Sequence, residues 1–154
     1  MRKVLDSAGL KALEFEEGST PTAETAADKI GVHVGQIAKS LLFRGSSGRV
    51  ALIVCAGDKK VNSGRLKRLC GEKMSMTGLE ETFELTGFKP GGVCPFGVEG
   101  IDIYIDDSLK VWETIYPAAG TNSTGVPVTY EALMSVTRAK TCSVCDPAVG
   151  ISAS

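Results

Sequence analysis

The chain has 154 residues, a length that fits one compact domain and is short for two. Hydrophobic residues make up 43% and charged residues 23%, which is typical of a globular protein and excludes a disordered or fibrous chain. The formal net charge of −1 argues against tight, sequence-independent binding to long nucleic acids.

Targeting and membrane segments are not evident. The longest apolar runs are about strand length, well below the roughly 20 residues of a membrane-spanning helix. The first residues carry charges and lack the apolar core of a secretory leader. We therefore expect a single domain over residues 1–154, located in the cytoplasm and without membrane contact.

The first third of the chain predicts two helices and a β-hairpin. Apolar residues at helical spacing predict a short amphipathic helix over residues 1–13. A threonine–proline start and a glycine end predict a second helix over residues 20–31. Alternating residues 36–44 and the apolar run 49–56, joined by the Gly-Ser-Ser-Gly sequence at 45–48, predict two antiparallel strands.

The middle of the chain predicts two further helices around a short strand. A basic helix is expected to begin at Asn62 or Ser63 and to end at Gly71, before a strand over residues 74–76. Thr77 and Glu80 have capping-box spacing. We expect them to start a helix that runs to about Gly87 and buries Phe83.

The last third predicts three strands, one helix and a tail. A half-exposed strand is expected over residues 101–106, and further extended segments over 113–117 and 126–128. A final helix is predicted from Thr129 to about Arg138, followed by a frayed tail over 139–154. Helices and strands thus mix along the chain, which predicts the α/β class.

Common catalytic motifs are absent, including the phosphate-binding loop, the dinucleotide-binding glycine motif, the zinc-protease helix and the serine-hydrolase elbow. His33 is the only histidine, and we interpret it as an incidental residue of a connecting turn. Cys142 and Cys145 have the spacing of a metal or redox pair but lack the partners of either site. The five cysteines are expected to be reduced thiols, and we expect no metal and no cofactor.

Lys39 breaks the pattern of its strand, because it shares a face with three apolar residues, Ile37, Leu41 and Phe43. Such a lysine either extends to the end of the strand or lines a cavity where its charge meets an anionic ligand, and spacing does not decide between them. The Gly/Pro-rich segment 90–97 and a second glycine segment at 120–125 suit close backbone contact with a ligand. Together these features predict a pocket without an acid–base dyad.

Six cations lie between residues 59 and 73: Lys59, Lys60, Arg65, Lys67, Arg68 and Lys73. They fit either a solvated helix face or a local contact with RNA.

Several segments, in the same order, resemble the YbaK/prolyl-tRNA-editing family, also known as the synthetase-associated domain. They are residues 22–27, residues 36–43 with Lys39, the Gly-Gly-Val-Cys-Pro-Phe-Gly loop at 91–97, and residues 115–120. The resemblance covers about residues 15–138.

The resemblance implies a curled mixed sheet or barrel-like core with flanking helices, and a freestanding deacylase of mischarged tRNA, often tRNA-Pro. It implies that activity depends on Lys39, which would hold the terminal phosphate or ribose, with the Ser40 hydroxyl beside it. It places the backbone carbonyl of Gly91 near the amino group of the substrate. An activated ester needs little beyond positioning and fixed dipoles, so a catalytic histidine is not required. The further substrate-binding residues would be Gly92, Pro95, Gly97, Ala118 and Gly120, and the cations of residues 59–68 would contact the acceptor stem.

Three positions depart from the branch of the family that deacylates Cys-tRNA. Ser40 stands where that branch has threonine, Ala118 where it has serine, and Pro127 where it has aspartate. Ser40 keeps a hydroxyl and is a mild change, whereas Ala118 weakens any assignment of cysteine as the amino acid removed. Pro127 bears on the size and specificity of the pocket.

Two alternatives come from other classes of protein. One is a non-catalytic module that binds the aminoacyl or acceptor end and assists a prolyl-tRNA synthetase or another synthetase. The other is a thiol-redox or metal protein built on Cys142 and Cys145.

Overall fold

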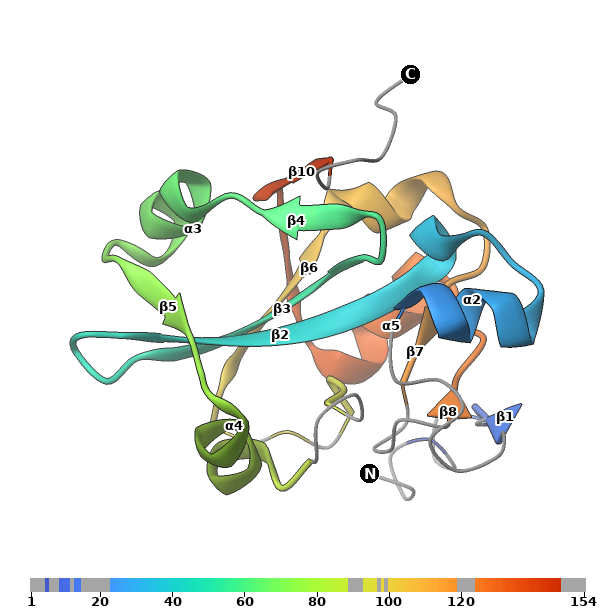
Figure 1. Cartoon of the computed structure of the whole chain (residues 1–154), viewed down its shortest axis with the longest axis horizontal. Coiled ribbons are helices and arrows are strands. Elements are labelled where there is room, and N and C mark those ends of the chain that lie inside the picture. The colour runs from blue at the N-terminus through green and yellow to red at the C-terminus, as the bar shows by residue number, and fades with distance from the viewer. Residues whose placement is uncertain are drawn as a thin grey trace.

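The computed structural model describes residues 5, 9–11, 13–14, 23–88, 93–96, 98, 100–118 and 124–147. Figure 1 shows helices placed around the long strands β2 and β3. The helices are α2 (Ala23–Ile30), α3 (Ser63–Cys70), α4 (Leu79–Thr86) and α5 (Tyr130–Thr137), with 3-10 turns η1 (Val34–Gln36) and η2 (Asp107–Val111). None of the helices in the described part of the chain has the length and apolar character needed to cross a bilayer.

The strands form one central sheet and two small ones. The central sheet has the order β5 (Met74–Met76), β2 (Ile37–Gly45), β3 (Val50–Ala56), β6 (Asp102–Asp106), β9 (Lys140–Cys142), and β7 (Tyr116–Pro117) also pairs with β2. The small sheets pair β1 (Leu13–Glu14) with β8 (Thr124–Gly125), and β4 (Lys59–Val61) with β10 (Cys145–Pro147). The sheet is mixed, as expected, because β2 and β3 are antiparallel whereas β3, β6 and β9 are parallel. The described strands leave it open at β5 and β9, so they do not close a barrel.

Apolar side chains cover both faces of the central sheet. Alternate residues of a strand point to opposite faces, and the antiparallel register of β2 and β3 fixes which residues share a face. On the face covered by α5, the core includes Val54, Ile105, Phe96 and Leu133. On the face covered by α3, it includes Phe43, Ile53, Leu66 and Val144.

Helices α3 and α5 begin and end at residues that the sequence predicts. The Asn62 side chain accepts a hydrogen bond from the Arg65 amide at 3.0 Å, and the Thr129 hydroxyl accepts one from the Ala132 amide at 3.1 Å. Gly71 ends α3 with φ of 78°, a left-handed conformation that glycine adopts without strain. The predicted hairpin of β2 and β3 is also confirmed.

The predicted start of α4 is wrong by one residue. Gly78, not Thr77, is its N-cap, because the Thr77 amide donates to the Leu42 carbonyl at 3.0 Å and so continues the pairing of β5 with β2. Phe83, expected to be buried, is 50% exposed. The helix predicted over residues 1–13 falls mainly outside the described residues, and Leu13 lies in β1.

The frayed tail predicted after residue 138 is also wrong over the segment that the structure describes. Strand β9 pairs in parallel with β6, and β10 pairs with β4. Strand β6 therefore lies inside the sheet, and Tyr104 and Asp106 are buried instead of lining an exposed face. The Asp106 carboxylate accepts a hydrogen bond from the Val144 amide at 2.8 Å, which fixes the link between β9 and β10.

Candidate functional site

Lys39 is half-buried in the first half of β2. It pairs with Cys55 of β3 and shares the sheet face that α3 covers. Its Nζ donates a hydrogen bond to the Lys59 carbonyl at the start of β4. None of the described carboxylates forms an ion pair with this ammonium group. The side chain therefore crosses to β4, where a neutral carbonyl is its hydrogen-bond partner among the described residues.

Ser40 points to the opposite face of β2, because neighbouring residues of a strand alternate. Its Oγ is buried and has no hydrogen-bond partner among the described residues. The structure thus separates the two side chains that the sequence places together. A buried hydroxyl without a partner costs about 1–3 kcal/mol, so Ser40 carries an unused donor and acceptor at this position.

The second edge of β2 is partly uncovered. Strand β7 pairs with residues 37–38, and β5 pairs with residues 43–45. Among the described strands, none pairs with residues 39–41 on this edge. Lys39 and Ser40 therefore lie on a stretch of β2 whose second edge is unpaired among the described strands, each on its own face.

The predicted glycine contacts lie outside the described residues, namely Gly91, Gly92, Gly97 and Gly120. Two of their neighbours are described. Pro95 is fully buried, and Ala118 contacts the core on the Ser40 face. The glycine contacts themselves stay predictions.

The basic residues of β4 and α3 lie on the same sheet face as Lys39. Arg65 forms an ion pair with Asp146, with Nη1 and Oδ1 separated by 3.2 Å. Lys67 and Arg68 are exposed, and no described side chain pairs with either. These two cations are therefore available for an anionic partner.

Of the two Cys-x-x-Cys thiols, Cys142 is buried and Cys145 is partly buried. Burial and, after it, the Asp106 carboxylate raise the pKa of Cys142 to about 12. A hydrogen bond with the Cys55 thiol, together with burial, raises the pKa of Cys145. Protonated thiols are poor nucleophiles and poor metal ligands. The described residues also include no group of three His, Cys, Asp or Glu side chains able to hold a metal ion.

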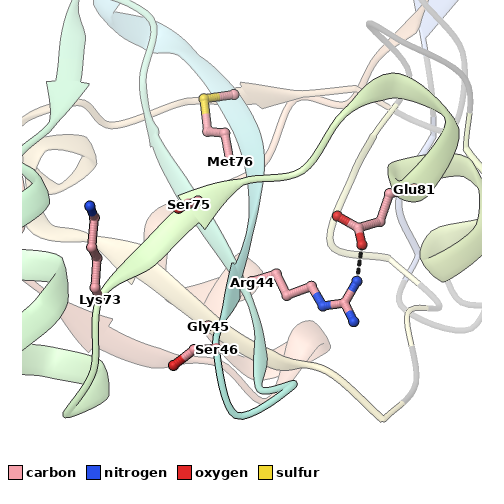
Figure 2. Close-up of a pocket in the computed structure, with 7 residues that line it drawn as sticks. All are labelled: Arg44, Gly45, Ser46, Lys73, Ser75, Met76 and Glu81. Atoms are coloured by element: carbon pink, nitrogen blue, oxygen red, sulfur yellow. Dashed lines mark hydrogen bonds and ion pairs between the residues drawn. The ribbon is translucent and has the colours of Figure 1, made fainter.

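A hollow of about 480 Å³ lies at the other end of β2, away from Lys39. Figure 2 shows that its polar side chains do not converge. Arg44 turns toward Glu81 and forms an ion pair with it, whereas Lys73 points away from both. We therefore do not assign this hollow as the active site.

His33 has structural contacts that its sequence neighbours do not predict. It is the N-cap of η1, where Nδ1 accepts a hydrogen bond from the Gly35 amide at 2.9 Å. Its ring stacks on Trp112, with ring centroids 5.0 Å apart and planes at 29°. No local pattern signals this pair, because the two residues meet only after folding.

Comparison with solved structures gives the class of protein. The chain matches a crystal structure described as a candidate trans-editing enzyme for prolyl-tRNA synthetase, with a TM-score of 0.86, 34% identity and 94% of each chain covered. The fold is thus that of an editing domain, a class of hydrolase.

The family follows from the sequence comparisons. The model of the family described as an aminoacyl-tRNA editing domain matches residues 17–136, so the chain belongs to this family, as the resemblance predicts. YwhH of Bacillus subtilis (strain 168) is 43% identical over 121 residues, which cover 78% of this chain and 76% of YwhH. A proline–tRNA ligase of Bacillus licheniformis is 34% identical over 116 residues, which cover 72% of this chain but only 20% of the ligase.

Proposed function

We propose that this chain acts in trans to hydrolyse the ester of mischarged tRNA, with tRNA of the proline type as its substrate. The proposal is supported by membership of the editing family and by similarity along 94% of a candidate trans-editing enzyme. Similarity to part of a proline–tRNA ligase favours the proline type. A prolyl-tRNA synthetase is accordingly the partner we propose.

The single observation that carries the chemistry is the half-buried Lys39 ammonium, which has no ionic partner among the described residues and lies on the unpaired stretch of β2. We infer that it binds the terminal phosphate or ribose of the tRNA. A cation that is already fixed in place binds the substrate without reorganising, which holds the ester in a defined position.

Ester hydrolysis then requires a water molecule on the side of the bound ester that faces away from Lys39. The water oxygen adds to the carbonyl carbon and gives up a proton, the bond to the ribose oxygen breaks, and that oxygen takes the proton. Ser40, on the opposite face, offers a hydroxyl with no other partner to the aminoacyl group. The segment from Gly91 to Gly97 supplies backbone groups that contact the amino group and the carbonyl in this proposal.

The cations of β4 and α3 provide the contact with the acceptor stem. Lys59, Lys60, Lys67 and Arg68 lie on the Lys39 face, and Arg65 contributes despite its ion pair with Asp146. Alanine at Lys67 and Arg68 is expected to reduce the slope of log affinity against log salt by about 1 for each phosphate that is no longer neutralised.

The test is deacylation of Ala-, Cys-, Ser- and Thr-tRNA-Pro by the wild type, Lys39→Ala and Lys140→Ala. Lys140 is an exposed lysine on the distant edge strand β9 and serves as the matched control. We expect one ester to be hydrolysed, a loss of about a hundredfold or more in Lys39→Ala, and no change in Lys140→Ala.

The alternative is a binding module that does not catalyse hydrolysis. It predicts that the wild type binds the acceptor end but leaves every ester intact or protects it from spontaneous hydrolysis. Such a result across the panel would refute the hydrolase proposal.

A further inference from the structure

The His33–Trp112 pair forms an aromatic surface near the start of β2. Trp112 is half-buried and lies over Gly35, where an added Cβ would be 3.0 Å from Cζ2 of the indole. One face of the His33 ring stacks on the indole, and His33 itself is exposed. No second ring contact of His33 is found among the described residues, so the other face of this imidazole is available for stacking.

Hydrogen bonds hold this imidazole in one orientation. Nδ1 accepts from the Gly35 amide, so the hydrogen of the neutral ring is on Nε2, which points away from η1. The Gln36 side chain accepts from the His33 amide at 3.1 Å and donates to the Thr114 carbonyl at 3.0 Å. An exposed ring that is already fixed loses little conformational entropy when a ligand stacks on it.

The aromatic pair and Lys39 are both linked to the turn between β3 and β4. A Cβ on Gly57 would lie 2.5 Å from the Val34 carbonyl of η1, so the turn touches the helix that His33 caps. Lys59, which follows this turn, accepts the hydrogen bond from Lys39. In Figure 1 the turn lies beside the start of β2, at the same end of the molecule.

We propose that the open face of the His33–Trp112 stack binds an unpaired nucleobase at the 3′ end of the tRNA. This inference rests on the proposed function, because the stack and the lysine that would hold the terminal phosphate or ribose are both linked to the turn between β3 and β4. The chemistry fits a base: a flat aromatic face for stacking, and an Nε2–H donor for an acceptor atom on the base edge. Binding of a base by this stack requires no charged side chain, whereas the basic residues of α3 bind phosphate through their charge.

Two His33 variants separate stacking from the capping role. His33→Asn removes the ring but keeps a side-chain acceptor for the Gly35 amide, since asparagine is a good N-cap. His33→Phe keeps an aromatic face but removes the acceptor. Val111→Ala is the matched control, because Val111 is an apolar neighbour of Trp112 that is 77% exposed.

The first probe is an RNA hairpin without an attached amino acid, which carries the acceptor stem and a single-stranded CCA end. The second probe is the same hairpin with the base of its last nucleotide removed. Affinity is measured by anisotropy of labelled RNA, and thermal unfolding of each variant is recorded. The fluorescence of Trp112, the only tryptophan of the chain, reports binding next to the stack.

We expect His33→Asn to raise the Kd of the CCA hairpin between about fivefold and a hundredfold and to leave the Kd of the baseless hairpin unchanged. His33→Phe keeps the stacking face but lacks the Nε2–H donor, so it should lose less affinity than His33→Asn while lowering the Tm. Unchanged affinity in His33→Asn, or an equal loss with both hairpins, would overturn the base-binding site. Deacylation that depends on Lys39 would then still support the proposed function, whereas no RNA binding and no deacylation by the wild type would overturn both.

Discussion

Replacing Asp106 with alanine is expected to lower the free energy of unfolding by about 3 kcal/mol. The side chain is 1% exposed and accepts two backbone hydrogen bonds, from the Val144 amide at 2.8 Å and the Ser108 amide at 3.0 Å. Removal of this acceptor leaves the buried Val144 amide unsatisfied, at a cost of about 2 kcal/mol. Removal of the N-cap of η2 at the Ser108 amide adds about 1 kcal/mol.

The assay is equilibrium unfolding in urea, with the m-value as a check that the extent of unfolding is unchanged. Asp106→Asn keeps one acceptor oxygen for the two amides, so its destabilisation is expected to be roughly half as large. Asp107→Ala is the control, because Asp107 is exposed and should change the free energy by less than about 0.5 kcal/mol. An Asp106→Ala protein within about 0.5 kcal/mol of the wild type, the spread of surface substitutions, would refute the reasoning.

Three further outcomes follow from the structure. Ser40→Ala should keep or slightly raise the free energy of unfolding, because it removes a buried hydroxyl without a partner among the described residues. The same variant should deacylate its substrate more slowly than the wild type. An unchanged deacylation rate would show that Ser40 is not part of the site. Gly57→Ala should lower the free energy of unfolding in urea by about 1–3 kcal/mol, because its Cβ would lie 2.5 Å from the Val34 carbonyl; equal stability would contradict this contact. Burial raises the Cys142 pKa from 9.0 to about 12, so the unfolded thiol ionises first. The stability it contributes is therefore full below about pH 9 and lost toward pH 12, and a Cys142→Ala protein should show a shallower fall of Tm over that range.

The family and part of the candidate site could be predicted from the sequence. The segments around Lys39 and the 91–97 loop resemble the editing family, and the family model matches nearly the same range. Alternation along β2 also predicts that Lys39 lies on a mostly apolar face, which the register confirms. The same alternation separates Lys39 from Ser40, although the two residues are neighbours in the chain and the resemblance groups them in one site.

The sequence by itself determined the features that depend only on interactions between residues a few positions apart in the chain. The Asn62 cap, the Gly71 end of α3 and the Thr129 cap of α5 each depend on hydrogen bonds or backbone angles inside one turn. Such interactions form wherever the local residues allow them, so a local pattern is enough to predict them.

Only the tertiary structure decided the features that join distant segments. Strands β9 and β10 have three residues each and are stabilised by pairing with β6 and β4. The carbonyl that Lys39 contacts and the stack of His33 on Trp112 likewise belong to partners far along the chain. Each of these contacts depends on how the sheet brings segments together, and local spacing does not encode that arrangement.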